Sequence, residues 1–279
     1  MQIVSTIAKL KVATSHYKSI GFVPTMGALH AGHIALVQQS VANNSCTVCS
    51  IFVNPTQFNN KQDFEKYPST IDADIALLQG AECTILYLPT VHEIYPNGIT
   101  NLKQYELGYL NTILDGPMRV GHFNGVCNVV QRLFEIVQPQ QAYFGLKDYQ
   151  QCMVITQLVT QMNWQHKVKL HLCPTVRMPN GLAMSSRNMR LTHVQQQQAA
   201  VIFQALSYVK QHITVGNASQ IHLRSETKIA EAGLIPEYLE IRHAINLHPV
   251  INWNGSDKLV CLAAAHLGTI RLIDNMLLN

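Results

Sequence analysis

Two histidines lie three residues apart in the segment PTMGALHAGH, which covers residues 24–33. Gly27 and Gly32 in that segment allow a tight turn and the close approach of a ligand. The segment follows a short apolar run and precedes a stretch of helical period, so we expect His30 and His33 on one face of a first helical turn. A helix start suits a phosphate, and two imidazoles there can donate hydrogen bonds to phosphoryl oxygens as charge builds.

Two simpler explanations of this histidine pair compete with a phosphate site. A single histidine at a helix start is most often a cap or a packing partner, although two histidines beside two glycines are less often so. A zinc ion would need a third ligand, and the sequence offers none nearby.

Polar amides follow a second apolar run. Residues 46–53 form a buried strand in this interpretation, and Asn54, Pro55 and Gln57 come directly after it. Open α/β sheets bind ligands beyond the carboxyl ends of their strands, where Asn54 and Gln57 can bind a polar substrate without using charge. Asn-Pro is also a common turn starter, which is an equally good explanation.

A third segment, AYFGLKDYQQ at residues 142–151, again runs from a strand through a glycine into a helix. Lys147 would lie at the helix start as a flexible cation suited to phosphate. Asp148 can cap the helix or bind ribose hydroxyls, and Gln151, four residues after Lys147, faces the same way. An ordinary capped helix with a surface lysine is the alternative.

The fourth segment, TVRMPNGLAMSSRN at residues 175–188, places two hydroxyls and an arginine in a loop, which suits a triphosphate. It lies within residues 149–225, a window without aspartate or glutamate. Cations without a counter-charge in that window indicate an anion site, although chance and an amide-rich helix would also explain them. The seven cations are Lys167, Lys169, Arg177, Arg187, Arg190, Lys210 and Arg224.

The composition excludes several function classes. The chain has 279 residues, and its 47% of hydrophobic residues excludes disorder. Only 13% are charged, and 42 Asn and Gln side chains outnumber the 36 charged ones. A net charge of +4 is too mild for a dedicated nucleic-acid binder, and no aromatic residue lies between Lys167 and Arg190 to stack on bases.

Membrane and secretory roles are not indicated either. No apolar run approaches the roughly 20 residues that span a bilayer, and no signal peptide is recognised. Seven cysteines without a framework spacing fit a reducing cytoplasm. Cys46 and Cys49 would point to opposite faces of a strand and are expected in the core.

Short apolar strands alternate with helices up to residue 175, which indicates βαβ units and a parallel sheet. We expect strands at 20–24, 46–53, 83–88, 141–144 and 167–173, and helices at 33–41, 70–78 (with Thr70 as N-cap), 124–137 and 148–162. Beyond residue 175 we expect one long helix at 192–212, opened by a capping box of Thr192 and Gln195, and strands at 238–242, 258–264 and 270–273. The predicted fold is therefore α/β: a Rossmann-like domain at 1–175 and a smaller α+β domain at 176–279.

In this order and at these separations, the four segments resemble the pantoate–β-alanine ligase family. The resemblance covers essentially the whole chain and includes YP at 67–68, IYPNG at 94–98, GHFNGV at 121–126 and LGTIRLIDN at 267–275. The histidine pair and MSSR at 184–187 are also similar to the wider nucleotidyltransferase superfamily. The resemblance implies an ATP- and pantoate-binding first domain, a second domain that acts as a lid, and a homodimer.

The activity that the resemblance implies has two half-reactions. The carboxylate of (R)-pantoate attacks the α-phosphate of ATP, which gives pantoyl adenylate and diphosphate. The amine of β-alanine then displaces AMP to form pantothenate. Because pantoate is already an anion, the first step needs alignment and charge neutralisation rather than a strong base.

The resemblance also implies roles for individual residues. His33 is the proton donor, with His30 and Lys147 beside it in catalysis. Gln57 and Gln151 bind pantoate, Gln57 also meets β-alanine, and Asn54 is grouped with them. The ATP-binding set is Met26, Gly27, Ala28, Leu29, His30, Ala31, Gly32, His33, Gly145, Leu146, Lys147, Asp148, Val176, Met184, Ser185, Ser186 and Arg187.

The sequence departs from the family pattern at a few positions. Leu146 stands where glutamate is frequent, Val120 stands where proline is usual, and the residues before Gly181 lack the usual acidic residue. Of an acidic pair that can hold Mg²⁺, Ala73 replaces one member and Asp74 is left as the candidate ligand. Magnesium bound mainly through phosphates and water would tolerate this loss.

Three other functions are weighed against the ligase. Another adenylyl transferase acting on a nucleotide would call for Arg or Lys at the positions of Gln57 and Gln151. A non-catalytic nucleotide sensor would have lost His30, His33 or Lys147, and all three are present. A nucleic-acid binder lacks the necessary aromatic residues, as described above.

Overall fold

The computed structural model describes residues 1–59, 64–216, 218–250 and 253–279. The chain forms two compact units: the first comprises Met1–Leu146 and Gln150–Pro174, and the second comprises Lys147–Tyr149 and Thr175–Asn279. Lys147–Tyr149 thus belong to the second unit although their neighbours on both sides belong to the first.

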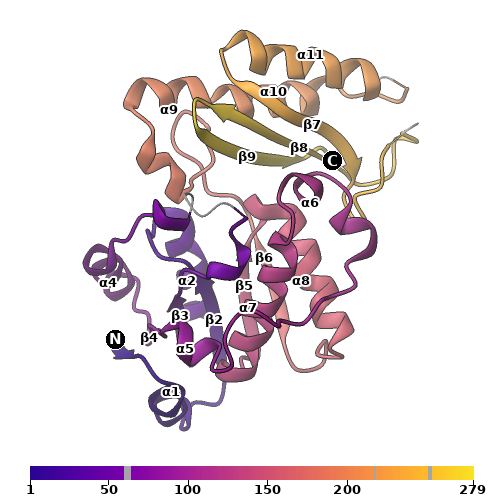
Figure 1. The fold of residues 1–279 in the computed structure, drawn as a ribbon. Coiled ribbons are helices and arrows are strands. Elements are labelled where there is room, and N and C mark those ends of the chain that lie inside the picture. Colours follow the sequence, from indigo (N-terminus) through magenta and orange to yellow (C-terminus); the bar gives the residue numbers. More distant parts are fainter. Residues whose placement is uncertain (60–63, 217, 251–252) are drawn as a thin grey trace. The chain divides into compact units, whose positions relative to one another are not determined.

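The first unit is built on a parallel sheet (Figure 1), which has six strands in the described part of the chain. Its strands, in the order β1-β4-β3-β2-β5-β6, are β1 Gln2–Val4, β4 Ile85–Tyr87, β3 Cys46–Ile51, β2 Ile20–Thr25, β5 Gln141–Gly145 and β6 Lys169–Cys173. The chain leaves β2 toward β3 on one side and later adds β5 on its other side. This reversal is the switch point at which open α/β sheets bind ligands. It confirms the predicted α/β class with a Rossmann-like sheet.

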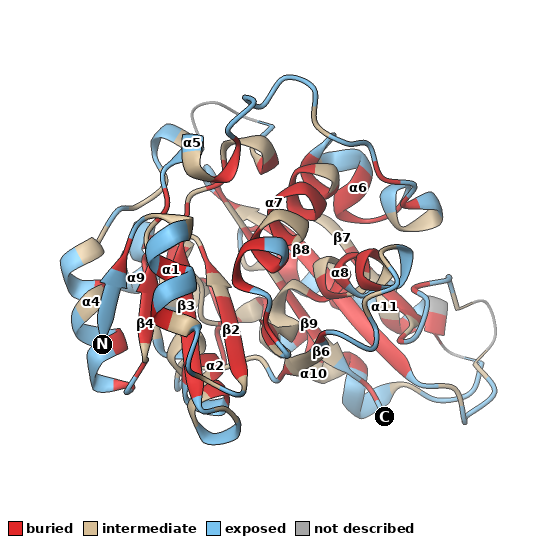
Figure 2. Cartoon of the chain, turned by 90° about the horizontal axis from the view of Figure 1, so that it is seen from below, coloured by how far each residue is buried: buried red, intermediate tan, exposed pale blue. Residues whose placement is uncertain are grey.

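Helices cover both faces of this sheet because successive strand residues point to opposite sides. Phe22 belongs to an apolar cluster with α7 and α8, whereas Val23 belongs to a second cluster with α2 and α4. Cys46 and Cys49 divide between the same two clusters, as predicted. The inner strands β2, β3 and β4 are largely buried (Figure 2), whereas the edge strands β1 and β6 are more exposed. The helices are α1 Ile7–Thr14, α2 Ala31–Asn43, α4 Ile71–Gly80, α5 Val91–Ile94, α6 Asp115–Met118, α7 His122–Val137 and α8 Tyr149–Gln161.

The second unit contains an antiparallel sheet with its own core. Strands β7 (Ile235–His243), β8 (Leu259–Leu267) and β9 (Ile270–Leu277) lie in that order. One face of the sheet packs on α10 (Val201–His212) and α11 (Ala218–Glu231) around Leu239, Cys261 and Leu272. This arrangement confirms the α+β character predicted for the C-terminal part.

Several expected elements differ from the structure. The single helix expected at 192–212 is two helices, α9 (His193–Ala199) and α10, because the N–H of Ala200 turns back to the carbonyl of Gln197 in a tighter bond. The capping box of Thr192 and Gln195 is confirmed. Sequence patterns missed β1, α1 and α11; in α1 only Leu10 and Ala13 are buried, so the apolar period is weak.

Candidate active site

The turn from β2 into α2 is held by a buried carboxylate. Gly27 (φ +84°) and Ala28 (φ +50°) both adopt the left-handed conformation. The Asp74 carboxylate accepts hydrogen bonds from the backbone N–H groups of Ala28 (2.9 Å) and Leu29 (2.8 Å). Thr70 lies at the N-cap position of α4 but, contrary to expectation, does not cap it; its hydroxyl donates to Asp74 instead (3.0 Å). Asp74, only 1% exposed, therefore fixes the shape of the turn.

This engagement bears on the predicted magnesium site. Both carboxylate oxygens of Asp74 already accept backbone N–H groups. Within the described residues there is no group of three or more His, Cys, Asp or Glu side chains that could hold a metal ion. These bonds give Asp74 a structural role in the turn, and its part in holding magnesium stays a prediction of the sequence.

The two histidines form a reciprocal cap at the start of α2. His30 is the N-cap residue, and its Nδ1 accepts from the N–H of Gly32 (3.1 Å). The Nδ1 of His33 accepts from the N–H of His30 (3.3 Å), and the two rings lie 4.0 Å apart between centroids. Because each Nδ1 accepts, each neutral imidazole carries its hydrogen on Nε2. The structure thus brings the pair together on the first turn, as predicted.

The amides that follow β3 form a buried network. The side-chain NH₂ of Asn54 donates to the Oε1 of Gln57 (3.1 Å) and to the carbonyl of Gly125 (3.2 Å). The Oδ1 of Asn54 accepts from the hydroxyls of Tyr95 and Thr56, each at 3.0 Å. Asn54, 1% exposed, is therefore engaged in orienting Gln57 and in joining η1 (Pro55–Gln57) to α7. The Nε2 of Gln57 lies 3.0 Å from the Sδ of Met26, a weak acceptor that links this network to the β2 turn.

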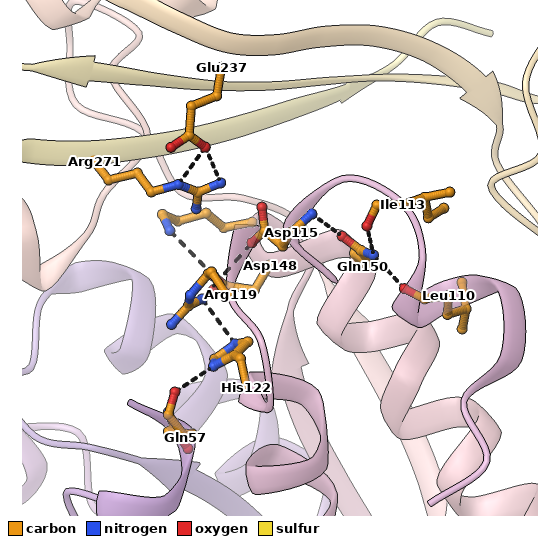
Figure 3. Close-up of polar contacts among 11 residues, drawn as sticks. Gln57, Leu110, Ile113, Asp115, Arg119, His122, Asp148, Gln150, Glu237 and Arg271 are labelled. Atoms are coloured by element: carbon orange, nitrogen blue, oxygen red, sulfur yellow. Dashed lines mark hydrogen bonds and ion pairs between the residues drawn. The ribbon is translucent and has the colours of Figure 1, made fainter. Parts of the chain in front are cut away.

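A chain of polar contacts supports Gln57 from α7 (Figure 3). The Nδ1 of His122 lies 2.8 Å from the main-chain carbonyl of Gln57, and its Nε2 lies 2.9 Å from Arg119. A carbonyl only accepts and a guanidinium only donates, so His122 is neutral with its hydrogen on Nδ1. Arg119 in turn lies 3.9 Å from the Asp115 carboxylate. Among the site residues, sequence reasoning missed His122 and Arg119, although GHFNGV was a family signature.

Gln150, to which the sequence assigned no role, anchors the segment that carries Asp115 (Figure 3). Its Nε2 donates to the carbonyls of Leu110 (2.7 Å) and Ile113 (2.9 Å), and its Oε1 accepts from the N–H of Asp115 (3.0 Å). Its neighbour Gln151, the predicted pantoate ligand, is half-buried in the first turn of α8.

In the second unit, the predicted phosphate-binding residues occupy two segments. Lys147 and Asp148 lie in η3 (Leu146–Asp148), directly after β5, and their charged groups are 3.6 Å apart. Ser185 caps η4 (Ser186–Arg190), and its hydroxyl accepts from the N–H of Arg187 (3.2 Å). The N–H of Met184 bonds the carbonyl of Val176 (3.0 Å), so these two predicted ATP-binding residues are neighbours.

The inference of seven unpaired cations is wrong in detail. Arg177 forms a two-pronged ion pair with Asp274 at 2.6 and 3.0 Å, a partner 97 residues further along the chain. Lys210 donates to the carbonyl of Leu277. Lys167 and Lys169 belong to the first unit, whereas Arg187 and Arg190 belong to the second. A window along the sequence is not a patch in space, because strand pairing supplies charges from distant segments.

Two paired histidines begin the helix that follows the central strand β2, and a buried amide network follows the neighbouring strand β3. Together these features define the class of α/β enzymes with a histidine-glycine-histidine motif. The family model described as pantoate-beta-alanine ligase matches residues 2–277, so the chain belongs to the pantoate–β-alanine ligase family. Its activity is that of a pantoate–β-alanine ligase, which forms pantothenate.

The similarity to individual relatives extends over nearly the full length of both chains. The chain is 44% identical to pantothenate synthetases from Azobacteroides pseudotrichonymphae (99% of both chains) and Bacteroides fragilis (99% of this chain and 98% of the relative). The crystal structure of pantothenate synthetase from Thermus thermophilus has a TM-score of 0.92 at 38% identity and covers 100% of this chain and 99% of its own. A ligase from Francisella tularensis, complexed with "Beta-gamma ATP" and β-alanine, has a TM-score of 0.83 at 36% identity, over 100% of this chain and 98% of its own. No helix in the described residues is long and apolar enough to cross a membrane.

Proposed function

We propose that this chain binds ATP, pantoate and β-alanine and makes pantothenate through a pantoyl-adenylate intermediate. An oxygen of the pantoate carboxylate forms a bond to the α-phosphorus, and the bond from that phosphorus to the bridging oxygen breaks to release diphosphate. The β-alanine amine then attacks the acyl carbon and expels AMP, losing a proton as the amide forms. The relative from Francisella tularensis, whose complex contains an ATP ligand and β-alanine, supports these substrates.

The observation that carries this proposal is the reciprocal histidine cap. Because both Nδ1 atoms bond backbone N–H groups, His30 and His33 each present an Nε2–H donor at the start of α2. Two such donors at the positive end of a helix suit the charge that develops on the α- and β-phosphoryl oxygens. His33 acts as the proton donor to the leaving diphosphate, Lys147 and Arg187 neutralise its charge, and the hydroxyls of Ser185 and Ser186 donate hydrogen bonds to it.

Pantoate binding is assigned to Gln57 and Gln151. Gln57 is held in place by Asn54 on its side chain and by His122 on its main chain, so its amide is oriented before substrate arrives. Neutral amides bind hydroxyl and carboxylate groups without adding a cation that would compete for the triphosphate. Asn54 contributes by orienting Gln57 rather than through a contact of its own with substrate.

Magnesium, in this proposal, accompanies ATP through phosphate oxygens and water. This assignment is consistent with the engagement of Asp74 by backbone N–H groups. The lid role of the second unit, the homodimer and the cytoplasmic location stay predictions of the sequence.

The experiment that tests the mechanism is exchange of labelled diphosphate into ATP with pantoate present and β-alanine absent. An adenylate intermediate predicts pantoate-dependent exchange, which other hydroxy acids of similar size do not support. If folded protein that makes pantothenate shows no such exchange, the adenylate mechanism is wrong. If the protein makes no pantothenate at all, the substrate assignment is wrong.

A further inference from the structure

The Asp274–Asn275 pair within β9 belongs to the LGTIRLIDN signature, to which the ligase chemistry assigns no task. Both side chains are buried, at 4% and 7% exposure. The backbone N–H of Asn275 donates to the Oδ1 of Asp274 (2.7 Å), which ties the two residues together. Buried polar groups of this kind are costly unless each is bonded, so their partners show what the pair holds.

Asp274 holds the hairpin that leads into the Met184–Arg187 loop. Arg177 binds both carboxylate oxygens of Asp274, and its guanidinium also donates to the carbonyls of Gly181 and Asn275, each at 3.1 Å. Arg177 and Ala183 pair across the hairpin. The guanidinium carbon lies 4.6 Å from the centre of the Phe203 ring, which covers one of its faces. A planar cation bound on its edges and one face keeps little freedom.

Asn275 holds the second phosphate-binding segment. Its Nδ2 donates to the main-chain carbonyl of Lys147 at 2.9 Å, across 128 residues of sequence. Lys147–Tyr149 belong to the second unit although Leu146 and Gln150 belong to the first. A second bond of this segment, from the Tyr149 hydroxyl to the carbonyl of Ala244 (2.9 Å), also stays within the second unit. The backbone that carries the Lys147 ammonium is thus fastened to β9.

We propose that Asn275 is a positioning residue for the ligase reaction, which acts through Lys147. Asp274 and Arg177 fasten the hairpin that leads into the Met184–Arg187 loop to the same strand. The two phosphate-binding segments therefore keep a fixed spacing within the second unit. This inference rests on the proposed role of Lys147 in binding ATP phosphates.

A double-mutant cycle on pantoate-dependent diphosphate exchange tests this proposal. Asn275→Ala removes the bond to Lys147 and is expected to lower kcat/KM for ATP about tenfold, the effect of losing one hydrogen bond of about 1.4 kcal/mol. In the Lys147→Ala background the same change is expected to cost less than about twofold, since the side chain that it positions is gone. The matched control is Asn279→Ala, which also removes a bond from a side-chain amide to a backbone carbonyl (Asp257, 2.9 Å) and is expected to leave exchange within about twofold.

Each outcome separates this inference from the proposed function. If Asn275→Ala costs the same factor with and without Lys147, the residue acts through the fold alone and the inference is wrong. If Lys147→Ala itself leaves exchange unchanged, the phosphate role of Lys147 fails and the inference fails with it. If Asn275→Ala does not fold, Asn275→Asp removes the same donor at constant volume, and its melting temperature and exchange rate replace those of the alanine variant.

Discussion

At the residue scale, the hydrogen-bond partners of individual histidine ring nitrogens distinguish the histidines of the site. In His30 and His33 one nitrogen caps α2 and the other is the donor that we propose for phosphate. In His122 the arrangement is opposite, because its Nδ1–H holds the main chain of Gln57 and its Nε2 accepts from Arg119. In the proposed mechanism the same residue type therefore serves catalysis in one place and positioning in another, and its hydrogen-bond partners distinguish the two roles.

His33→Asn separates these two duties. The Oδ1 of asparagine can replace the Nδ1 of His33 as acceptor for the N–H of His30, but asparagine is too short to offer a donor at the Nε2 position. We expect diphosphate exchange to fall about 10²–10³-fold, the usual cost of losing one transition-state donor. The melting temperature should stay within a few degrees, by circular dichroism. An exchange rate within fivefold of the unmodified protein would contradict the assigned role.

Asp74→Ala tests whether this carboxylate is a clamp or a metal ligand. Two buried N–H groups, of Ala28 and Leu29, lose a charged acceptor, which should lower the free energy of unfolding by about 2–5 kcal/mol. Urea unfolding in the presence of EDTA measures this loss without any metal contribution. The control is Asp72→Ala, an exposed position on the same turn of α4, with an expected change below about 0.5 kcal/mol. Unchanged stability of the Asp74 variant without metal would refute the clamp.

At the scale of secondary-structure elements, the close approach of α7 and η1 decides the geometry of the amide network. Helix α7 meets η1 at Gly125, where a Cβ would lie 2.2 Å from the carbonyl oxygen of Thr56. This contact lets Asn54 reach the carbonyl of Gly125 and lets His122 reach that of Gln57. The amide network therefore depends on one missing methyl group.

Gly125→Ala should push α7 away from η1. We expect a loss of about 1–3 kcal/mol in the free energy of unfolding, together with a higher KM for pantoate, since Gln57 loses its contact with His122 and Asn54 loses its bond to Gly125. The control is Gly80→Ala in α4, where a Cβ would meet no atom within 4 Å. That substitution should leave the free energy of unfolding unchanged or raise it slightly. An unchanged KM for pantoate in a destabilised Gly125→Ala protein would show that the contact between α7 and η1 does not affect pantoate binding.

At the scale of the whole molecule, the first and the second unit each have their own hydrophobic core. Six cysteines lie in the first unit and Cys261 lies in the core of the second, and all seven are within described residues and buried. Burial raises the pKa of the Cys46 and Cys83 thiols to about 11 and that of Cys127 to about 12. A thiol with a pKa of 11 is about one part in a thousand thiolate at pH 8, so these groups are poor nucleophiles.

Thiol labelling at pH 8 should therefore follow unfolding. We expect negligible reaction of the native protein with a thiol reagent over minutes and complete reaction of seven thiols in denaturant. At intermediate urea, peptide mapping should show Cys261 labelled at a rate different from the other six, because it reports on a different core. Fast labelling of any cysteine in the native protein would show that the site is accessible and would contradict this assignment.

Local patterns in the sequence predicted much of the fold and of the site. Alternating apolar strands and helices predicted the parallel sheet, and the strand-turn-helix segment predicted the shared face of His30 and His33. Each of these features depends on residues within a few positions of one another. Helix α1 escaped because only Leu10 and Ala13 are buried in it, and α11 escaped because most of its residues are polar although Ile221 and Ile229 reach the core. The break at Ala200 depends on one tighter backbone bond, which the apolar pattern does not reveal.

The sequence by itself determined which residues follow β2, β3 and β5, and these strands meet at the switch point of the sheet. Only the tertiary structure decided which polar groups bind each other. Asp74 clamps the backbone of Ala28, Arg177 belongs to Asp274, and Asn275 holds Lys147. The physical reason is that a buried polar group must find a partner, and strand order brings that partner from 46, 97 or 128 residues away.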